Sequence, residues 1–149
     1  MRLRVAVMPR KGGEILGAVR AALPRDGELM CLDGLCEREV AERLKRADIF
    51  VAISPFEAFG LPPLEAMCAG CCVLGFPGIG GFEFMRHRET AHVVRNGDVG
   101  ALVAALQDVC AAPLYRDALR SRAMAMAAYY TMERERAHLL RALGFSAAP

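Results

Sequence analysis

Two carboxylates, Glu57 and Glu65, stand in one short stretch of the chain with seven residues between them. Residues 58–63, which lie between them, form a segment rich in glycine and proline that is typical of a turn. An ionised carboxylate only accepts hydrogen bonds, and its two oxygens can accept from two hydroxyl groups at once. The pair therefore predicts two acceptor-only side chains in a ligand site, provided that the fold brings both of them to one surface.

The elements that must position this pair follow from the apolar pattern. Five short apolar runs predict strands at residues 3–8, 29–32, 49–53, 72–76 and 91–94. Helical patterns lie at residues 14–23, 37–46, 99–110 and 131–143, with further helices beginning near residues 62 and 113. Asp98 and Thr131 are suited to cap two of them. Strands that alternate with helices predict an α/β fold with a doubly wound parallel sheet of about five strands.

The second carboxylate lies next to two prolines. Pro62 or Pro63 suits the first helical position, which needs no backbone N–H, so we expect Glu65 in the first helical turn. Glu57 then falls in the loop above the carboxyl end of the preceding strand. Ligands of open α/β sheets bind at this rim, so both carboxylates are expected to face a ligand there.

Length and composition limit the class of protein. A chain of 149 residues is long enough for one domain with a full core, which we expect over residues 1–149 with C-terminal helices from about residue 113. The hydrophobic fraction is 54%, but no apolar run reaches the length of a membrane span. A net charge of +2 gives no reason to expect nucleic acid or an anionic membrane as a partner. The first residues lack the pattern of a signal peptide, so we expect a cytoplasmic protein.

The cysteines and histidines do not predict a metal site. Cys68 and Cys71 form a C-x-x-C pattern that resembles half of a zinc site. Their places at a helix end and before a buried strand are explained by small hydrophobic side chains without a metal. The three histidines have no shared spacing that indicates metal ligands, so we interpret them as surface or packing residues.

The stretch that holds the two carboxylates also resembles a known family. Residues 57–67, Glu-Ala-Phe-Gly-Leu-Pro-Pro-Leu-Glu-Ala-Met, followed by Ala69-Gly70 and Val73, are similar to the Glu-x7-Glu motif of retaining GT-B glycosyltransferases, family four or group 1. The pattern extends over most of the chain, from Arg10 to Asp98. The resemblance implies one Rossmann-like half of a GT-B fold, the carboxyl-terminal half that binds the nucleotide sugar.

Three departures from the family pattern weaken parts of this expectation. Ala58 stands where the family usually has glycine, which would matter if this position needs a positive φ or a very close backbone approach. Cys72 replaces the usual proline. The region between the first strand and Ala47-Asp48 is shorter than in the family, which predicts a sheet that is one strand smaller.

The resemblance implies a role for each residue of the rim. Glu65 would accept from the ribose hydroxyls, and Glu57 would contact the donor sugar. Arg10 and Lys11 match the basic pair that holds the donor phosphates, and Arg can bind two phosphate oxygens while Lys acts as a point charge. The backbone N–H groups of Ala58, Phe59, Gly60 and Leu61 and the glycine-rich loop with Gly80 and Gly81 would complete the phosphate site.

Each of these residues also has an interpretation without function. Glu65 alone would be a carboxylate that is stabilised at a helix start by the macrodipole, Glu57 a solvated loop residue, and Arg10 with Lys11 an exposed loop pair. A glycine loop alone is weak support for a ligand site, because turns use glycine anyway.

The implied reaction is transfer of a sugar from a nucleoside-diphosphate sugar to an acceptor with retention of configuration, without a cofactor or an obligatory metal. Glu57, Arg10 and Lys11 would carry it, the two cations and the loop amides by stabilising charge on the leaving phosphate. The acceptor site would lie in an N-terminal domain or a separate partner chain, so we expect the isolated chain to transfer sugar poorly or not at all. The sequence leaves open the base, the sugar, the acceptor and whether this chain stands alone.

Two other interpretations remain beside this one. The first is a non-catalytic nucleotide-binding or interaction module, favoured by Ala58, Cys72 and the short region before Asp48. The second is a flavodoxin-like or receiver-like domain, which the basic loop with Arg10 and Lys11 argues against.

The last helices predict self-association or binding to another polypeptide through an exposed apolar patch. The apolar residues concerned are Leu119, Met124, Met126, Tyr129, Tyr130, Leu139, Leu140 and Leu143.

Overall fold

The computed structural model describes residues 2–144, and its centre is a single β-sheet. The five strands are β1 (Arg4–Val7), β2 (Glu28–Cys31), β3 (Ile49–Ala52), β4 (Cys72–Gly75) and β5 (His92–Val93). All neighbouring strands are parallel, and their order is β2-β1-β3-β4-β5. The prediction of an α/β fold with a five-stranded parallel sheet is thereby confirmed.

The two central strands are apolar over their whole length. Every residue of β3 and β4 is buried, and neither strand shows the alternation of a sheet that faces water on one side. Continuous apolar runs of this kind are typical of parallel strands whose two faces are both covered by helices. The sequence pattern and the layered architecture therefore have one cause.

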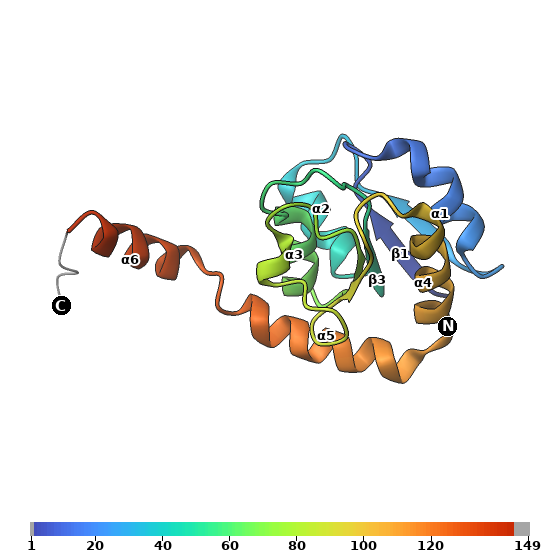
Figure 1. Cartoon of the computed structure of the whole chain (residues 1–149). Coiled ribbons are helices and arrows are strands. Elements are labelled where there is room, and N and C mark those ends of the chain that lie inside the picture. The colour runs from blue at the N-terminus through green and yellow to red at the C-terminus, as the bar shows by residue number, and fades with distance from the viewer. Residues whose placement is uncertain (1, 145–149) are drawn as a thin grey trace.

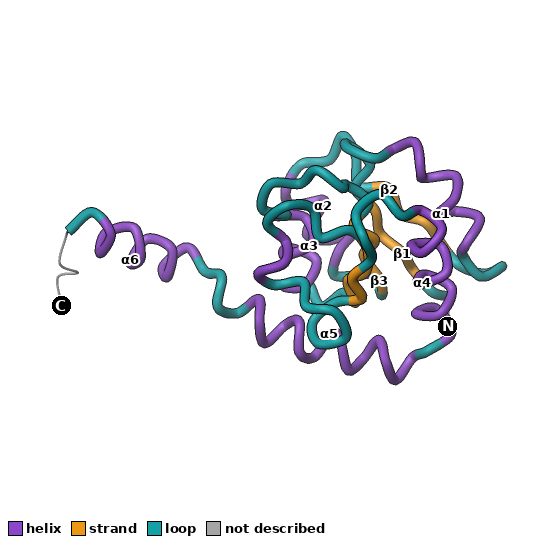
Figure 2. The backbone as a smooth tube through the Cα atoms, viewed as in Figure 1, coloured by secondary structure: helices purple, strands orange, loops and turns teal. Residues whose placement is uncertain are grey.

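Helices cover both faces of the sheet (Figures 1 and 2). The helical segments are η1 (Gly13–Ile15), α1 (Leu16–Ala22), α2 (Glu37–Leu44), α3 (Leu61–Cys68), η2 (Gly81–Glu83), α4 (Val99–Ala111), α5 (Pro113–Ala127) and α6 (Met132–Ala142). Helices α1 and α4 pack on one face, and α2 and α3 lie on the other. Two helical layers around a parallel sheet are a doubly wound fold.

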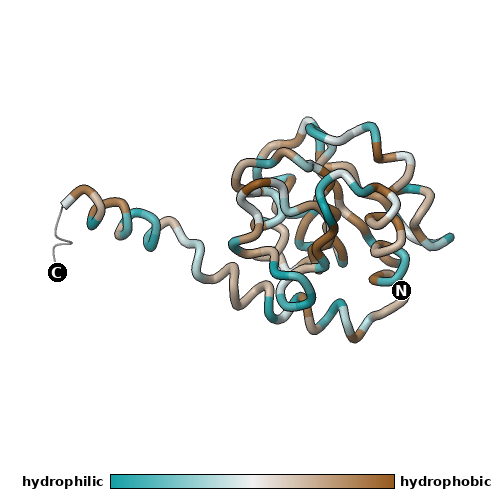
Figure 3. The backbone as a smooth tube through the Cα atoms, in the orientation of Figure 1, coloured by the Kyte–Doolittle hydropathy of each residue, from teal (hydrophilic) through white to brown (hydrophobic). Residues whose placement is uncertain are grey.

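Successive side chains of each strand enter opposite layers of the core. Ile49 and Val51 of β3 pack with α1 and α4, whereas Phe50 and Ala52 of the same strand pack with α2 and α3. This alternation follows from the two-residue period of a β-strand. The apolar colour of the tube is accordingly concentrated in the centre of the domain (Figure 3).

Helix α5 runs along the outside of both layers, and α6 then leads away from the domain (Figure 1). Leu119 of α5 belongs to the core on the α1 and α4 side, whereas Ala123 and Ala127 belong to the other. Arg120 fixes the helix, because its Nε donates a 2.6 Å hydrogen bond to the carbonyl oxygen of Gly70. The prediction that Leu119 is part of an exposed patch is wrong, because this side chain is 0% exposed.

The start of α3 differs from the sequence prediction. The helix begins at Leu61, with Pro62 and Pro63 at its second and third positions and Gly60 as the N-cap in the left-handed region, at φ 92°. All three first-turn positions lack an intrahelical acceptor for their N–H, so proline is tolerated at each of them. Glu65 is consequently the fifth residue and lies in the second turn. Its predicted place in the first turn is wrong.

Both predicted helix caps are confirmed. Asp98 Oδ1 accepts a 2.9 Å hydrogen bond from the Ala101 N–H at the start of α4, and Thr131 Oγ1 accepts one of 3.3 Å from Arg134 at the start of α6. These bonds satisfy backbone donors that have no partner within the helix. No helix within residues 2–144 combines the length and the apolarity that crossing a membrane would need.

Candidate functional site

A large cavity lies where the strand order reverses. The chain proceeds outward from β1 to β2 on one side and from β3 to β5 on the other, so the loops after β1 and β3 diverge at the carboxyl rim. A cavity of about 1050 Å³ opens there, between these loops and helices α2 and α3. This crevice is the place where doubly wound sheets bind their ligands.

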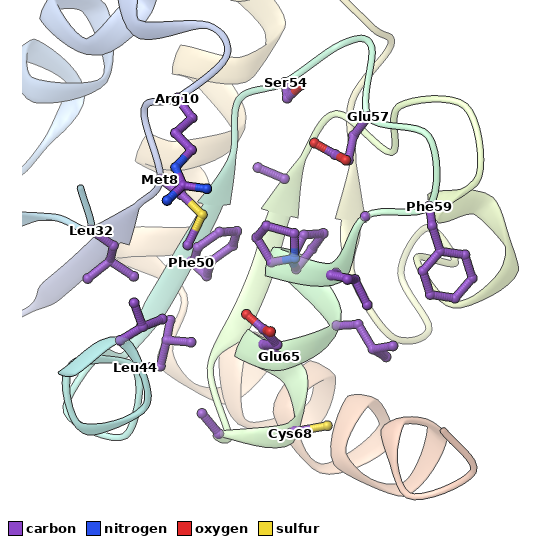
Figure 4. A pocket seen from close by; sticks show the side chains of 18 of the residues that line it. Met8, Arg10, Leu32, Leu44, Phe50, Ser54, Glu57, Phe59, Glu65 and Cys68 are labelled. Atoms are coloured by element: carbon purple, nitrogen blue, oxygen red, sulfur yellow. The ribbon is translucent and has the colours of Figure 1, made fainter. Parts of the chain in front are cut away.

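Three charged side chains converge on the cavity (Figure 4). Glu57 enters it from the loop after β3, Glu65 from α3, and Arg10 from the loop after β1. Lys11 also lines it. The fold therefore brings the two carboxylates and the basic pair to one surface, although these four residues come from three separate parts of the chain.

Lys11 and Glu57 form an ion pair across the crevice. Lys11 Nζ lies 3.6 Å from Glu57 Oε2, and the two side chains are 60% and 28% exposed. An exposed pair of this length contributes little to stability, so either partner can be released at low cost. The lysine is thus held at the mouth of the cavity while it remains available to another anion.

Close backbone contacts fix the loop that carries Glu57. On one side, a Cβ on Gly12 would lie 2.4 Å from the Ile53 carbonyl oxygen, and Gly12 adopts φ +95°. On the other side, a Cβ on Gly78 would lie 2.5 Å from the Glu57 carbonyl oxygen, which accepts a 2.7 Å hydrogen bond from the Ile79 N–H. Only glycine permits such approaches, and they leave the loop little freedom to move.

Glu65 faces the cavity from the second turn of α3. Partial burial raises the pKa of its carboxyl, and the nearby Glu37 carboxylate adds to this effect. Because the residue lies beyond the first turn, the explanation of Glu65 as a carboxylate stabilised at a helix start does not apply. An acid whose pKa is raised at a cavity wall is a candidate for a functional role.

The loop amides at residues 58–61 are free to bind a ligand. Within residues 2–144, none of these four N–H groups has a hydrogen-bond acceptor. Ala58 does not adopt a positive φ, so the alanine in place of the family's glycine causes no backbone strain. Phe59 turns its ring outward, where it packs at 5.6 Å from Phe84 and 6.2 Å from Tyr130 between ring centroids.

The two glycines of the second loop lie behind the Glu57 loop. Gly80 and Gly81 do not line the cavity. A Cβ on Gly80 would lie 2.2 Å from the Ala58 carbonyl oxygen, and the Gly81 N–H already donates to Pro77. These glycines therefore support the loop that carries the site, and a direct contact with a ligand stays a prediction.

An apolar wall, which the sequence did not single out, forms one end of the cavity. It contains side chains from α2, from β3 and from the segments that follow β1 and β2, namely Met8, Leu32, Leu35, Val40, Leu44 and Phe50. In the sequence these residues are explained by core packing, so no local signal distinguishes them. Their arrangement is suited to a flat apolar group such as a nucleotide base.

Two polar residues of the rim were also missed. The Ser54 hydroxyl is buried without a hydrogen-bond partner beside the cavity. Asn96, which follows the β5 region, forms two hydrogen bonds with the backbone of Gly78 through its side-chain amide oxygen and nitrogen. The Asn-Gly pair at residues 96–97 signals a turn, but nothing local predicts a contact that spans eighteen residues of sequence.

The cysteines are distributed over the core and the surface. Cys71 and Cys72 are buried, and burial raises the pKa of each thiol to about 12. Cys68 is exposed on α3 at the cavity wall, so its explanation as a buried hydrophobic residue is wrong. Across residues 2–144, no three His, Cys, Asp or Glu side chains are grouped so that they could hold a metal ion.

Comparison with known proteins places this geometry in a family. Residues 30–126 match the family described as Glycosyl transferases group 1. Over 47 residues, the chain is 45% identical to an alpha-1,6-glucosyltransferase from Actinobacillus pleuropneumoniae serotype 7 (strain AP76), a match that covers 32% of this chain and 14% of that protein. The family match includes both carboxylates.

Solved structures of low sequence identity share the fold. A sucrose-phosphate synthase from Thermosynechococcus elongatus has a TM-score of 0.76 at 23% identity, over 95% of this chain and 46% of that one. Anabaena HepE in complex with UDP-glucose has a TM-score of 0.78 at 16% identity, over 96% and 49%.

A third similar structure consists of one domain. The C-terminal domain of a glycosyl transferase group 1 family protein from Francisella tularensis has a TM-score of 0.68 at 16% identity, over 85% of this chain and 84% of that one. By contrast, this chain spans about half of the synthase and of HepE, and its match covers 14% of the alpha-1,6-glucosyltransferase.

Proposed function

The chain belongs to the family Glycosyl transferases group 1, and from its site we propose that it is the donor-binding half of a retaining glycosyltransferase. The observation that carries the proposal is the convergence of Glu57, Glu65, Arg10 and Lys11 on one cavity at the point where the strand order reverses. The donor is a nucleoside-diphosphate sugar. The UDP-glucose bound by a protein of the same fold supports this substrate class.

The cavity offers a partner for each part of such a donor. The apolar wall accepts the base, and the Glu65 carboxylate accepts hydrogen bonds from the ribose hydroxyls. Arg10, Lys11 and the free N–H groups at residues 58–61 bind the diphosphate. Glu57 accepts from the hydroxyls of the sugar. The cavity of about 1050 Å³ is at the upper end of the sizes that hold small molecules.

Catalysis follows from the charge that develops in the reaction. When the bond between the sugar and the β-phosphate breaks, negative charge grows on the leaving nucleoside diphosphate. Arg10, Lys11 and the loop amides lie around the cavity in which this charge would appear, and cations and N–H groups at that place stabilise it electrostatically. Glu57 orients the sugar, and the proposal assigns no step to a metal or cofactor.

The acceptor site belongs to a polypeptide beyond this domain. The chain spans about half of two structures that share its fold, so we propose that an N-terminal domain or a separate chain completes the enzyme. The purified chain is then expected to bind donor but to transfer sugar poorly or not at all. We further propose that it acts in the cytoplasm, where nucleotide sugars would be its substrates.

The test is a calorimetric titration of the purified chain with UDP, GDP, ADP and dTDP. We expect one of them to bind, and Glu65→Ala to weaken that binding by about tenfold or more, because a lost hydrogen bond to a charged group costs roughly 1.5–3 kcal/mol. Glu14→Ala is the matched control, since Glu14 is an exposed carboxylate in η1 that does not line the cavity.

Three outcomes are informative. Binding of one nucleotide that depends on Glu65 and not on Glu14 supports the donor site and identifies the base. Binding that is unchanged in Glu65→Ala contradicts the assigned role of this residue. No binding by a folded wild-type chain contradicts the proposal.

The alternative of a non-catalytic nucleotide-binding module is favoured by Ala58 and Cys72, which depart from the family pattern. It predicts the same nucleotide binding, so titration does not separate the two. The two functions are separated by an assay of sugar transfer in which the chain is combined with the acceptor half. The enzyme transfers sugar in this assay, and the non-catalytic module does not.

A further inference from the structure

The side chain of Asn96 pairs with the backbone of Gly78. The Gly78 N–H donates to Asn96 Oδ1 at 3.1 Å, and Asn96 Nδ2 donates to the Gly78 carbonyl oxygen at 2.8 Å. A backbone N–H only donates and a carbonyl only accepts, so this pairing requires an amide and fixes its orientation. Asn96 thus attaches the loop after β5 to the loop after β4.

Gly78 in turn lies directly against Glu57. A Cβ on Gly78 would be 2.5 Å from the Glu57 carbonyl oxygen and 3.0 Å from both its nitrogen and its Cβ. The next residue, Ile79, donates its N–H to the same carbonyl oxygen at 2.7 Å. Gly78 is held at φ +64° in this contact. Any shift of the Gly78 peptide is therefore transmitted to the backbone of Glu57.

Asn96 has no counterpart elsewhere on the rim. Among residues 2–144, it is the one side chain that donates or accepts a hydrogen bond to the backbone of the loops at residues 54–60 and 77–80. The other hydrogen bonds of these loops within residues 2–144 join backbone atoms to backbone atoms. Among the described residues 2–144, the exposed ion pair with Lys11 is the one polar contact of the Glu57 carboxylate. Its position consequently depends on the backbone beneath it.

We propose that Asn96 is a positioning residue of the donor site, which fixes Glu57 and the free amides at residues 58–61 through Gly78 and Ile79. This inference rests on the proposed function for the identity of the ligand. Asn96 does not line the cavity, so it acts on the ligand only through the loop. Its loss is expected to loosen the loop and to weaken donor binding while the sheet and its two cores remain intact.

Three variants of the full chain separate this role from packing. Asn96→Ala removes both hydrogen bonds. Asn96→Asp keeps the shape of the side chain and the oxygen that accepts from the Gly78 N–H. At pH 7, however, a carboxylate oxygen replaces the Nδ2 donor, so the hydrogen bond to the Gly78 carbonyl oxygen is lost. Arg95→Ala is the control, because the exposed side chain of the neighbouring Arg95 has no hydrogen bond or ion pair within residues 2–144.

Two measurements are made on each variant. The first is amide hydrogen exchange by NMR at Gly78 and Ile79, which reports the loop itself and needs no ligand. The second is the affinity for whichever of UDP, GDP, ADP and dTDP the wild-type chain binds. It is made at a temperature at which circular dichroism shows every variant to be fully folded, so that a general loss of stability does not change the measured affinity.

We expect faster exchange of both amides in Asn96→Ala and a loss of affinity of about five- to tenfold, as one or two ordinary hydrogen bonds would give. Asn96→Asp loses affinity as well, because shape alone does not replace the missing donor. Arg95→Ala matches the wild type in both measurements.

Several results overturn the inference. Unchanged exchange at Ile79 in Asn96→Ala means that Asn96 does not hold the loop. Faster exchange with wild-type affinity means that the loop is held but that the site does not depend on it. Wild-type behaviour of Asn96→Asp assigns the residue to packing. If the wild-type chain binds no nucleotide, the proposed function fails and the positioning role fails with it, while the exchange data still decide whether Asn96 clamps the loop.

Discussion

Lys11 Nζ lies 3.6 Å from Glu57 Oε2, across the crevice between the loops after β1 and β3. The cation assigned to the phosphates is thus paired with the carboxylate assigned to the sugar. A bound diphosphate would compete with Glu57 for Lys11, and it would also be repelled by the Glu57 charge. The ion pair therefore opposes the binding of the nucleotide part of the donor.

This arrangement predicts an unusual gain of affinity. We expect Glu57→Gln to bind the free nucleoside diphosphate about two- to fivefold more tightly. The change releases Lys11 from its ion pair and removes a negative charge that repels the diphosphate, and interactions between exposed charges have about this strength. The nucleotide sugar should gain less than the free diphosphate, since its sugar loses a carboxylate partner. Calorimetry with both ligands measures this difference, with Glu14→Gln as the control. Weaker binding of the free diphosphate by Glu57→Gln would contradict the competition.

The raised pKa of Glu65 predicts a pH dependence of donor binding. The carboxyl must be ionised to accept from two hydroxyls, and burial together with Glu37 raises its pKa above the ordinary 4.5. Affinity for a nucleotide sugar should therefore begin to fall, as pH is lowered, at a higher pH than an ordinary glutamate would cause. Titration of the affinity from pH 7.5 downward measures this.

Two variants test the assignment of that pH dependence. Glu65→Gln should bind weakly at every pH and lose this dependence. Glu37→Gln removes the repelling charge, so the fall in affinity should move to lower pH. A fall that stays in place in both variants assigns the titration to another group.

The glycine contacts predict which substitutions damage the fold. Gly12→Ala places a Cβ 2.4 Å from the Ile53 carbonyl oxygen at φ +95°, whereas Gly97→Ala at φ +81° meets nothing within 4 Å. In both variants an alanine in the left-handed region lowers the free energy of unfolding by about 1 kcal/mol. Gly12→Ala must also displace the neighbouring backbone, so we expect a total loss of about 3 kcal/mol for this variant. Urea unfolding of the two variants and the wild type tests the difference. Equal losses would mean that the loop yields easily.

His92 predicts a loss of stability in mild acid. Burial is the main cause that lowers its pKa, the nearby His87 and Arg88 lower it further, and Asp108 opposes them. The unfolded chain then takes up the proton at a higher pH than the folded chain, so the free energy of unfolding decreases as pH falls below about 6.5. Urea unfolding between about pH 5 and 7.5 should show a shallower slope in His92→Asn. His138→Asn, an exposed change on α6, should leave the slope unchanged.

The sequence predicted the sheet well because one physical pattern decides it. Strands buried on both faces need continuous apolar runs, and each of the five runs became a strand of the predicted sheet, with ends that differ from the prediction by at most one residue. Those ends are set by neighbours. Asp48 lies just before β3 and accepts the Arg4 N–H through Oδ2 at 2.8 Å. Such a contact across the sheet has no local signal.

The carboxylate pair was placed at the correct rim because the loop after a parallel strand always emerges there. The sequence did not predict correctly which turn of α3 holds Glu65. The first three helical positions tolerate proline equally, so the two prolines do not show where the helix begins. Leu119 has the same helical spacing whether it faces the core or solvent. Only the path of α5 across both layers decides it.

Helix α6 predicts self-association of the chain. It leads away from the domain (Figure 1). Met132 and Leu139 of this helix and Leu143, its C-cap residue, follow at helical spacing and are 83%, 56% and 62% exposed. Burial of these exposed apolar side chains by another surface is favourable, so a projecting helix of this kind tends to bind a partner. We expect sedimentation velocity to show association that increases with concentration and is lost in the double variant Leu139→Gln, Leu143→Gln. Leu114→Gln, at an 85% exposed leucine of α5, is the control and should associate like the wild type. A chain that stays monomeric at millimolar concentration would instead assign these side chains to a different polypeptide, and a search for the acceptor half would then begin with proteins that bind α6.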